Sequence, residues 1–451
     1  MARLRALVAR AVELRGGEGP ALGWATAYFF LLLASYYVIR PLRDEMGVRG
    51  SENALSWLFV GTLAGTAALN PLFGALVSRL TRKVFVPVVY RVLLGSLVLF
   101  WALLTFGPEG WRLPVAQAFF IWASVFNLFA VSVFWGFLAD LFRPEEGRRL
   151  FGFIAVGGTL GAVAGAGLTT LLARPLGPTN LILLAALLLE GAVFCVRGLV
   201  RHFHVDDVAR NREGAVAEPE GVPPGTGVLA GLSTVSRSGY LLAISLFLLF
   251  FTVSSTFLYF EQARIVKATF ADSAGRTAFF ASIDLWVNLL AAFTQVFLSG
   301  RIVRALGVGG TLVALPVLTA AGFVALAVSP TAGILALVMV TRRAGNFALF
   351  RPAREVLFTV LPREEKYAAK NFVDTFVYRF GDVVGAFADK GLRALGAVGA
   401  TLAGLFLPVA VAWALLAAWL GRRQARLAEV RGRETPPGPA AAIIPAPWTG
   451  S

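Results

Sequence analysis

Twelve long apolar runs constrain the fold of this chain more than any other feature. A helix needs about 20 apolar residues to cross the hydrocarbon core of a bilayer, and the runs have about that length. Hydrophobic residues make up 57% of the sequence and charged residues only 15%. A soluble protein must cover its surface with polar side chains, so this composition argues against a soluble fold. The sequence therefore predicts an all-α, polytopic membrane protein with twelve transmembrane helices. The runs lie at roughly 21–39, 53–78, 84–106, 114–140, 149–173, 177–199, 238–262, 275–300, 307–329, 331–356, 369–389 and 395–420.

The runs form two sets of six, divided by a polar stretch with several acidic residues and a Pro-Pro pair. The first run is too long for a signal-peptide core and has no cleavage pattern, so it is predicted to be a retained helix. Proline and alanine dominate the residues after Arg433, a composition typical of disorder. The predicted units are a cytoplasmic N-terminal segment (1–20), an N-terminal six-helix half (21–201), a cytoplasmic linker (202–237), a C-terminal six-helix half (238–420) and a cytoplasmic, disordered tail (421–451).

The net charge of +15 has its source in membrane topology. The basic residues are spread between apolar runs instead of gathering on one module, which argues against nucleic-acid binding. Most of them lie in segments on the same side as the N-terminus, and such segments are cytoplasmic by the positive-inside rule. Arginine far outnumbers lysine, and alanine and glycine abound, as in GC-rich bacterial genomes. We expect a bacterial inner-membrane protein with both termini in the cytoplasm.

A short motif recurs before the fifth and the eleventh runs. It is Phe-Arg-Pro-Glu-Glu at 142–146 and Leu-Pro-Arg-Glu-Glu at 361–365, and each copy is followed by basic residues and a phenylalanine. Arg43 near the end of the first run matches Arg264 near the end of the seventh at nearly the same offset. Positive-inside bias alone would explain basic clusters, but the shared Glu-Glu pair favours an internal repeat. Six spans per copy give both halves the same orientation, as in transporters of the major facilitator type.

Charged side chains stand inside or at the ends of several runs. A charge at the centre of a bilayer costs about 2.5–3.5 kcal/mol, so such residues usually face a cavity or a partner. Helical spacing groups them on faces, as Arg343, Asn346, Phe350 and Arg354 in the tenth run and Asn371, Asp374, Tyr378 and Asp382 in the eleventh. The residues predicted on this ground to bind a substrate are Tyr36, Arg40, Arg43, Arg264, Arg343 and Arg354. Those predicted to pair with cations or to couple transport to an ion are Asp44, Asp284, Asp374 and Asp382.

These cations also have structural interpretations. Arg40, Arg43 and Arg264 lie near the ends of runs, where long side chains snorkel to the lipid headgroups. The charged residues at 351–355 could form ion pairs in a cytoplasmic gate or loop. Both interpretations stay open at the level of sequence.

Arg342 and Arg343 are harder to place at an interface, since they fall near mid-depth of the tenth run. Adjacent helical positions point about 100° apart, so we expect one guanidinium to face the pathway and the other to pair with a carboxylate. Asp284, in the eighth run, is either that partner or a site for a proton or cation.

Several arginines around one pathway favour an anionic substrate, because guanidinium groups form bidentate bonds to phosphate and carboxylate. Interleaved aromatic residues could stack on a planar ring. No nucleophile and base stand in a catalytic arrangement, so no enzymatic chemistry and no cofactor are predicted. His202 and His204 lack further ligands, so no metal site is predicted either. Gly157, Gly158, Gly161 and Gly165 form a small-residue face that predicts close helix packing.

Three blocks of sequence resemble a known family. They are Ser-Tyr-Tyr-Val-Ile-Arg-Pro-Leu-Arg-Asp at 35–44, Phe-Trp-Gly-Phe at 134–137 with Glu145-Glu146 and Arg148-Arg149, and Phe-Arg-Pro-Ala-Arg-Glu at 350–355 with Glu364-Glu365-Lys366, Lys370 and Asp374. Their order and spacing, over roughly residues 25–420, resemble the ATP:ADP antiporters of plastids and intracellular bacteria, within the major facilitator superfamily. The resemblance implies a major-facilitator-like fold and exchange of nucleotides. By position it implies that Arg40, Arg43, Arg354, Lys366 and Lys370 bind phosphate. Arg43 replaces a lysine of the family, and Pro41 replaces an acidic residue.

The sequence thus predicts a secondary transporter of an anionic, phosphate-bearing metabolite, with nucleotide exchange by alternating access as the first hypothesis. The counter-substrate or a proton would be the coupling partner. A second hypothesis keeps the fold and assigns a proton-coupled transporter of an amphipathic compound or lipid, driven through Asp284. A third, from another class, is a non-transporting membrane scaffold that works through its linker and tail.

Overall fold

The computed structural model describes residues 18–79, 82–202, 228–397 and 399–434. Within these ranges the regular elements are all helical. Most of the predicted N-terminal segment (1–20), much of the linker (202–237) and the end of the tail (421–451) lie outside the described residues. The first set of helices is α2 (Glu18–Arg49), α3 (Glu52–Arg79), α4 (Arg82–Phe106), the short η1 (Glu109–Trp111), α5 (Arg112–Leu141), α6 (Pro144–Leu176) and α7 (Pro178–His202).

The second set follows after residue 227 and contains two π-helical turns. Its elements are α9 (Val228–Ser236), α10 (Gly239–Thr269), α11 (Ser273–Phe297), α12 (Ser299–Val328), α13 (Ala332–Gly345), the π-helix η2 (Asn346–Phe350), α14 (Arg351–Leu357), α15 (Arg363–Phe372), the π-helix η3 (Val373–Val377), α16 (Tyr378–Ala394) and α17 (Ala400–Glu434). Since α13, η2 and α14 run on without a break, as do α15, η3 and α16, each trio makes one long helical stretch.

Ten helical stretches of the described chain are long and apolar enough to cross a membrane. Two further predicted runs also form helices inside the bundle. These are α3, which packs against α5 and α16, and the more highly charged α15–η3–α16 stretch, whose α16 packs against α10. The protein is therefore a polytopic, all-α membrane protein, as the apolar runs predict.

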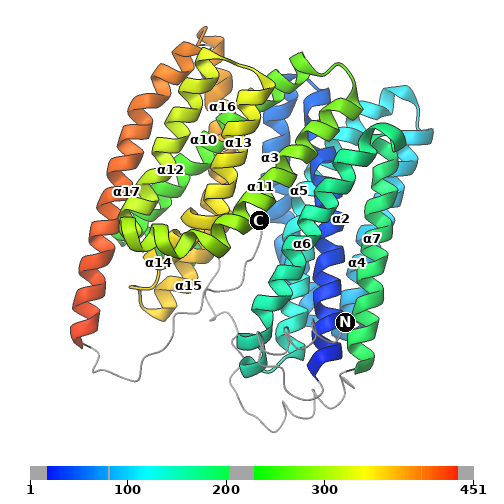
Figure 1. The fold of residues 1–451 in the computed structure, drawn as a ribbon, viewed down its shortest axis with the longest axis horizontal. Coiled ribbons are helices and arrows are strands. Elements are labelled where there is room, and N and C mark those ends of the chain that lie inside the picture. The colour runs from blue at the N-terminus through cyan, green and yellow to red at the C-terminus, as the bar shows by residue number, and fades with distance from the viewer. Residues whose placement is uncertain (1–17, 80–81, 203–227, 398, 435–451) are drawn as a thin grey trace.

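Figure 1 shows the two sets side by side, with α2 to α7 on the right and most of α10 to α17 on the left. Within the first set α2 packs against α5, α6 and α7, and within the second α10 packs against α16 and α17. Contacts between the sets run through α11, which lies against α6 and α2, and through α16, which lies against α3. We call the end where α2 begins at Glu18 and α17 ends at Glu434 the proximal end, and the opposite end the distal end.

Glycines allow the closest helix contacts in both sets. A Cβ added at Gly161 or Gly165 of α6 would collide with backbone carbonyl oxygens of α2, those of Phe30 and Ala34. This is the close packing that the small-residue face predicts. In the second set the added Cβ of Gly381, in α16, would collide with Thr252 of α10. Helices α6 and α16, which both follow a copy of the repeated motif, therefore pack in the same way on the first long helix of their own set, α2 and α10.

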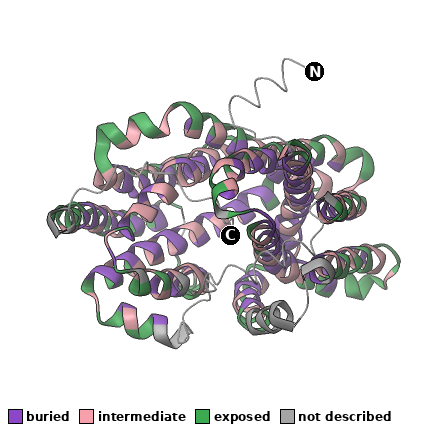
Figure 2. Cartoon of the chain, turned by 90° about the horizontal axis from the view of Figure 1, so that it is seen from below, coloured by how far each residue is buried: buried purple, intermediate pink, exposed green. Residues whose placement is uncertain are grey.

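The burial pattern matches a bilayer as solvent. Figure 2, seen along the bundle, shows exposed residues mostly on the outer faces and buried ones mostly between helices. Large apolar side chains such as Leu171, Phe293 and Leu415 are exposed on these outer faces. Lipid tails are as apolar as leucine, so such faces are stable in a membrane.

Two boundaries differ from the predicted units. Residues 228–236, predicted as part of the linker, form α9, which packs against α15 and α10. The segment is short but apolar, and Gly231 lets its backbone approach the side chain of Phe372. Helix α17 continues to Glu434, beyond residue 420, where the disordered tail was predicted to begin.

Candidate substrate site between the two helix sets

A cavity of about 470 Å³ lies between the two sets at mid-depth. This volume falls within the range of about 300–1,000 Å³ that is usual for small-molecule sites. Helices α2, α3, α5 and α6 line one part of the cavity, and α10, α11, α13, η2, α14 and α16 line the other. Six of the lining residues are arginines and two are aspartates: Arg40, Arg43, Arg342, Arg343, Arg351, Arg379, Asp44 and Asp382.

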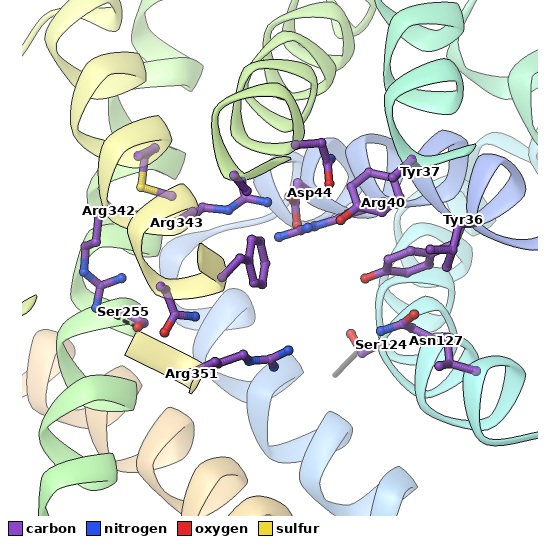
Figure 3. Close-up of a pocket in the computed structure, with 18 of the residues that line it drawn as sticks. Tyr36, Tyr37, Arg40, Asp44, Ser124, Asn127, Ser255, Arg342, Arg343 and Arg351 are labelled. Atoms are coloured by element: carbon purple, nitrogen blue, oxygen red, sulfur yellow. Dashed lines mark hydrogen bonds between the residues drawn. The ribbon is translucent and has the colours of Figure 1, made fainter. Parts of the chain in front are cut away.

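Asp284 of α11 joins arginines from two other helices. The Arg343 Nη2 donates a hydrogen bond of 2.5 Å to Asp284 Oδ1, and Arg40 Nη1 lies 3.7 Å from the same oxygen. The Asp284 side chain is only 1% exposed, and its Oδ2 has no hydrogen-bond partner. Figure 3 shows the side chains of Arg40 and Arg343 pointing toward each other at the cavity. Asp284 thus pairs with Arg343. The predicted division of roles, with one arginine in the pathway and the other on a carboxylate, is wrong, because Arg342 and Arg343 both line the cavity.

Arg342 is held in a different way from its neighbour. Its guanidinium donates to Thr319 Oγ1 at 3.0 Å, to Ser254 Oγ at 3.0 Å and to Ser255 Oγ at 2.9 Å. It also lies 5.1 Å from the ring centroid of Phe251. The residue is 4% exposed and ties α13 to α10 and α12. Because hydroxyl groups satisfy its donors without cancelling its charge, Arg342 adds positive potential beside the cavity.

A second carboxylate, Asp44, lies on α2. It is 3.6 Å from Arg43 Nη1 and accepts a 3.0 Å hydrogen bond from the Tyr259 hydroxyl of α10. The Arg43 guanidinium lies 4.5 Å from the ring centroid of Phe120, a distance typical of a cation–π contact. Arg40 and Arg43 therefore turn into the protein at the cavity, which excludes snorkelling to headgroups for these two residues.

The π-helical turns decide which side chains of the tenth and eleventh runs face the cavity. A regular helix would place Phe350 on the cavity side with Arg343 and Asn346, but η2 inserts one extra residue. Phe350 is therefore buried in a core cluster, and Arg351 lines the cavity. In the eleventh run Tyr378, Arg379 and Asp382 line the cavity after η3.

Asp382 completes the set of cavity carboxylates. Its Oδ2 lies 3.5 Å from Arg379 Nη1, and its Oδ1 accepts a 3.3 Å hydrogen bond from the Thr256 hydroxyl. Both Arg379 and Asp382 belong to α16, so this ion pair lies within one helix.

The first set offers an uncharged, polar wall to the same cavity. Tyr36, Tyr37, Ser124 and Asn127 project from α2 and α5 on the side away from Arg342, Arg343 and Arg351 (Figure 3). Tyr36 was predicted from its spacing with Arg40. Ser124 and Asn127 were missed, because single polar residues in an apolar run give no signal that separates cavity lining from packing.

Ion pairs between the two sets concentrate at the distal end. Glu45 of α2 is fully buried and lies 2.9 Å from Arg49 Nη2 and 3.1 Å from Arg276 Nη2 of α11. Arg49 also donates to the Ser273 hydroxyl at 3.1 Å. Lys390 of α16 donates to the Asn53 side chain of α3 at 2.6 Å. These contacts hold the two sets together on the distal side of the cavity.

Arg264 belongs to this distal cluster and does not line the cavity. It pairs with Glu52 of α3 at 3.0 Å, with Glu261 at 3.1 Å and, by a short contact, with Asp389 of α16. The spacing of residues on α10 predicts the direction in which the Arg264 side chain points. Arg264 nevertheless lies closer to the distal end than the cavity does, where its acidic neighbours pair with it.

Four more predicted residues lie toward the proximal end. Arg354 pairs with Asp374 at 3.0 Å, and Lys370 pairs with Glu355 at 2.7 Å. Neither these residues nor Lys366 lines the cavity. Among the described residues the site thus contains Tyr36, Arg40, Arg43, Arg343, Asp44, Asp284 and Asp382 from the predicted set, and it adds Tyr37, Arg342, Arg351 and Arg379.

Comparisons with known proteins agree with this architecture. The family model described as Major Facilitator Superfamily matches residues 21–386. ADP,ATP carrier protein 1 of Chlamydia trachomatis (serovar D) is 24% identical over 338 residues, covering 66% of this chain and 62% of that protein. ADP,ATP carrier protein 1 of Chlamydia pneumoniae is 21% identical over 342 residues, covering 68% of this chain and 66% of that protein. The chain thus matches slightly less than two thirds of the length of these relatives, and the resemblance to ATP:ADP antiporters is confirmed.

Solved structures of transporters share the fold. A POT peptide transporter in complex with sulfate superposes with a TM-score of 0.62 at 14% identity, covering 94% of this chain and 99% of that chain. The nucleoside transporter NupG superposes with a TM-score of 0.58 at 14% identity, covering 90% of this chain and 98% of that chain. At this identity the likeness concerns the fold alone. With the family model matching most of its length, the chain belongs to the major facilitator superfamily.

Proposed function

We propose that this protein exchanges anionic, phosphate-bearing metabolites across the membrane, with nucleotides of the ATP and ADP type as first substrates. The observation that carries the proposal is the charge of the cavity. Six arginines line it, against two aspartates, Asp44 and Asp382, and the buried Asp284 pairs with Arg40 and Arg343. Cations therefore outnumber carboxylates among the described lining residues, in a place where charge is costly. An anion with several negative charges would balance them.

The uncharged residues that line the cavity support a nucleotide in particular. Tyr36, Tyr37 and Asn127 line it from the first set, and Phe347 and Tyr378 line it from the second. Aromatic faces stack on planar bases, and an amide side chain can hydrogen-bond to a base edge. Phosphates would lie at the arginines of α2, α13 and α14, with the base toward α5. The names of the Chlamydia relatives point to the same class of substrate.

The arrangement of contacts supports transport by alternating access. The distal ion pairs hold the two sets together at one end, and substrate would enter from the proximal end. Rocking of the sets about the cavity would then expose the site to the other side. The proposal includes a bacterial inner membrane with the proximal end in the cytoplasm, and the distribution of basic residues supports this orientation and cytoplasmic termini.

The two other hypotheses receive less support. An amphipathic or lipid substrate would be served by an apolar pathway, and six arginines make this one strongly polar. A non-transporting scaffold has no need of a cavity lined by buried cations at mid-depth.

The direct test is uptake of labelled ATP, ADP, AMP and inorganic phosphate into proteoliposomes loaded with the same compounds. Arg40→Gln and Arg343→Gln should each lower exchange at least tenfold, because each removes a guanidinium from the site. Arg112→Gln is the matched control: this arginine is exposed, lies outside the cavity and pairs only weakly with Glu109 at 3.6 Å. Absence of exchange with all four compounds would refute the proposal.

A further inference from the structure

Asp284 differs from the other two cavity carboxylates in what it binds. Asp44 and Asp382 each pair with an arginine of their own helix, Arg43 and Arg379. Asp284 instead pairs with arginines of two other helices, α2 and α13, through a single oxygen. Among the described cavity residues, this ion pair connects the two helix sets.

The donors that Asp284 occupies are the ones an oxyanion needs. A guanidinium binds carboxylate and phosphate oxygens with the same planar, bidentate geometry. Arg343 is 14% exposed and Arg40 is 18% exposed, so both can be reached from the cavity while Asp284 lies behind them at 1%. A phosphate arriving from the cavity would therefore compete with the Asp284 carboxylate for these two arginines.

The ion pair between Asp284 and Arg40 also leaves one acceptor and one donor without hydrogen-bond partners. Asp284 Oδ2 and the Arg40 Nε are buried and have no hydrogen-bond partner. A buried ion pair repays the cost of desolvation only when its remaining donors and acceptors are satisfied as well. This pair is therefore easier to open than a fully bonded one, and a ligand with several oxygens can offer Arg40 and Arg343 better geometry.

We propose that Asp284 is a tethered counter-anion, which neutralises Arg40 and Arg343 in the empty carrier and is displaced by the phosphate of the substrate. This inference rests on the proposed function and specifies how its site works. Because displacement breaks the Asp284–Arg40 ion pair between the sets, binding removes one of the contacts that hold the two halves together. When the ligand leaves, the carboxylate takes its place, which speeds release and restores the bond.

The test measures binding of inorganic pyrophosphate to purified protein by calorimetry. Asp284→Asn keeps the size of the side chain but removes the competing charge, so the Kd for pyrophosphate should fall at least tenfold. Exchange in proteoliposomes should become slower at saturating substrate, because release is no longer assisted. Glu190→Gln is the control, since it also removes one negative charge but lies outside the cavity, where it pairs with Arg91 at 3.8 Å, and its Kd should fall less than threefold.

The outcomes separate this inference from the proposed function. Wild-type protein that binds no pyrophosphate overturns both. Wild-type binding with an unchanged or higher Kd in Asp284→Asn overturns the tethered counter-anion alone, as does an equal gain in affinity in Glu190→Gln. A purely structural role for Asp284 predicts weaker binding and a lower melting temperature. If Asp284→Asn does not fold, Asp284→Ser, also neutral and small, takes its place with the same expected fall in Kd.

Discussion

Glu45 offers a test of how the distal end is kept closed. Glu45→Gln keeps the shape of the side chain but removes the charge that binds Arg276 across the two helix sets. Glu45 is fully buried, whereas Arg49 and Arg276 are 25% and 14% exposed. Breaking a fully buried ion pair costs about 3–5 kcal/mol, and hydrogen bonds to charged groups contribute about 1.5–3 kcal/mol. Because both arginines are partly exposed, we expect the loss of the Glu45 charge to cost about 1.5–3 kcal/mol, the lower of these two ranges. Since about 1.4 kcal/mol is a factor of ten, the population with an open distal end should rise tenfold or more.

The assay measures labelling of an introduced cysteine, which is practical because the chain contains a single native cysteine. Cys195 is buried in the first set, and Cys195→Ala gives a background without thiols. Thr62 lines the cavity and hydrogen-bonds only to the backbone of its own helix, so Thr62→Cys is a mild reporter substitution. A membrane-impermeant maleimide is added to intact cells, where, in the proposed orientation with the proximal end in the cytoplasm, it reaches the cavity through the distal end. Labelling of this reporter should be faster with Glu45→Gln.

The control makes the same chemical change at the surface. Glu109 is 89% exposed and lies 3.6 Å from Arg112, an ion pair worth less than about 1 kcal/mol. Glu109→Gln should leave the labelling rate unchanged. Equal labelling rates in the Glu45→Gln and Glu109→Gln proteins would refute the assignment of Glu45 to distal closure.

Three further substitutions test packing and the site. Gly161→Val should lower the melting temperature or abolish folding, because overpacking costs about 1–3 kcal/mol or more. Gly167→Val should not lower the melting temperature, because no neighbouring atom lies near its added Cβ. Arg342→Lys should lower the melting temperature while changing the Kd for ADP less than threefold, since it removes donors to three hydroxyl groups of the scaffold. In calorimetry with ADP, Arg351→Gln should raise the Kd at least tenfold and Arg354→Gln less than threefold, and the reverse order would contradict the register set by η2.

The sequence predicts the architecture well, because bilayer thickness sets the length of every apolar run. The repeated motif and the glycines of 157–165 also predict real packing, since a missing side chain is a local property that acts directly on a neighbouring helix. The N-terminal part of the site is predicted for the same reason. Tyr36, Arg40 and Arg43 stand on one regular helix, α2, and helical spacing places them correctly.

The second half of the site is harder to predict, because two quantities are missing from a pattern of residues. One is depth: Arg264 points in the predicted direction but lies in the distal cluster. The other is register: η2 adds a residue to its turn, and Arg351 replaces Phe350 at the cavity. Neither helix propensity nor hydrophobic spacing indicates a π-helical turn. Such turns occur frequently at functional sites.

The cations that line the cavity are all arginines, with no lysine or histidine among the described lining residues. A guanidinium stays protonated throughout the pH range in which proteins are stable, so the positive charge of the site is constant. The dianion of a phosphate ester instead takes up one proton near pH 6 and becomes a monoanion. For a phosphate-bearing substrate, an acidic medium on one side of the membrane would present a less charged species there than in a neutral cytoplasm. A pH gradient could thus bias the direction of exchange through the ionisation of the cargo, without any proton carried by the arginines of the transporter.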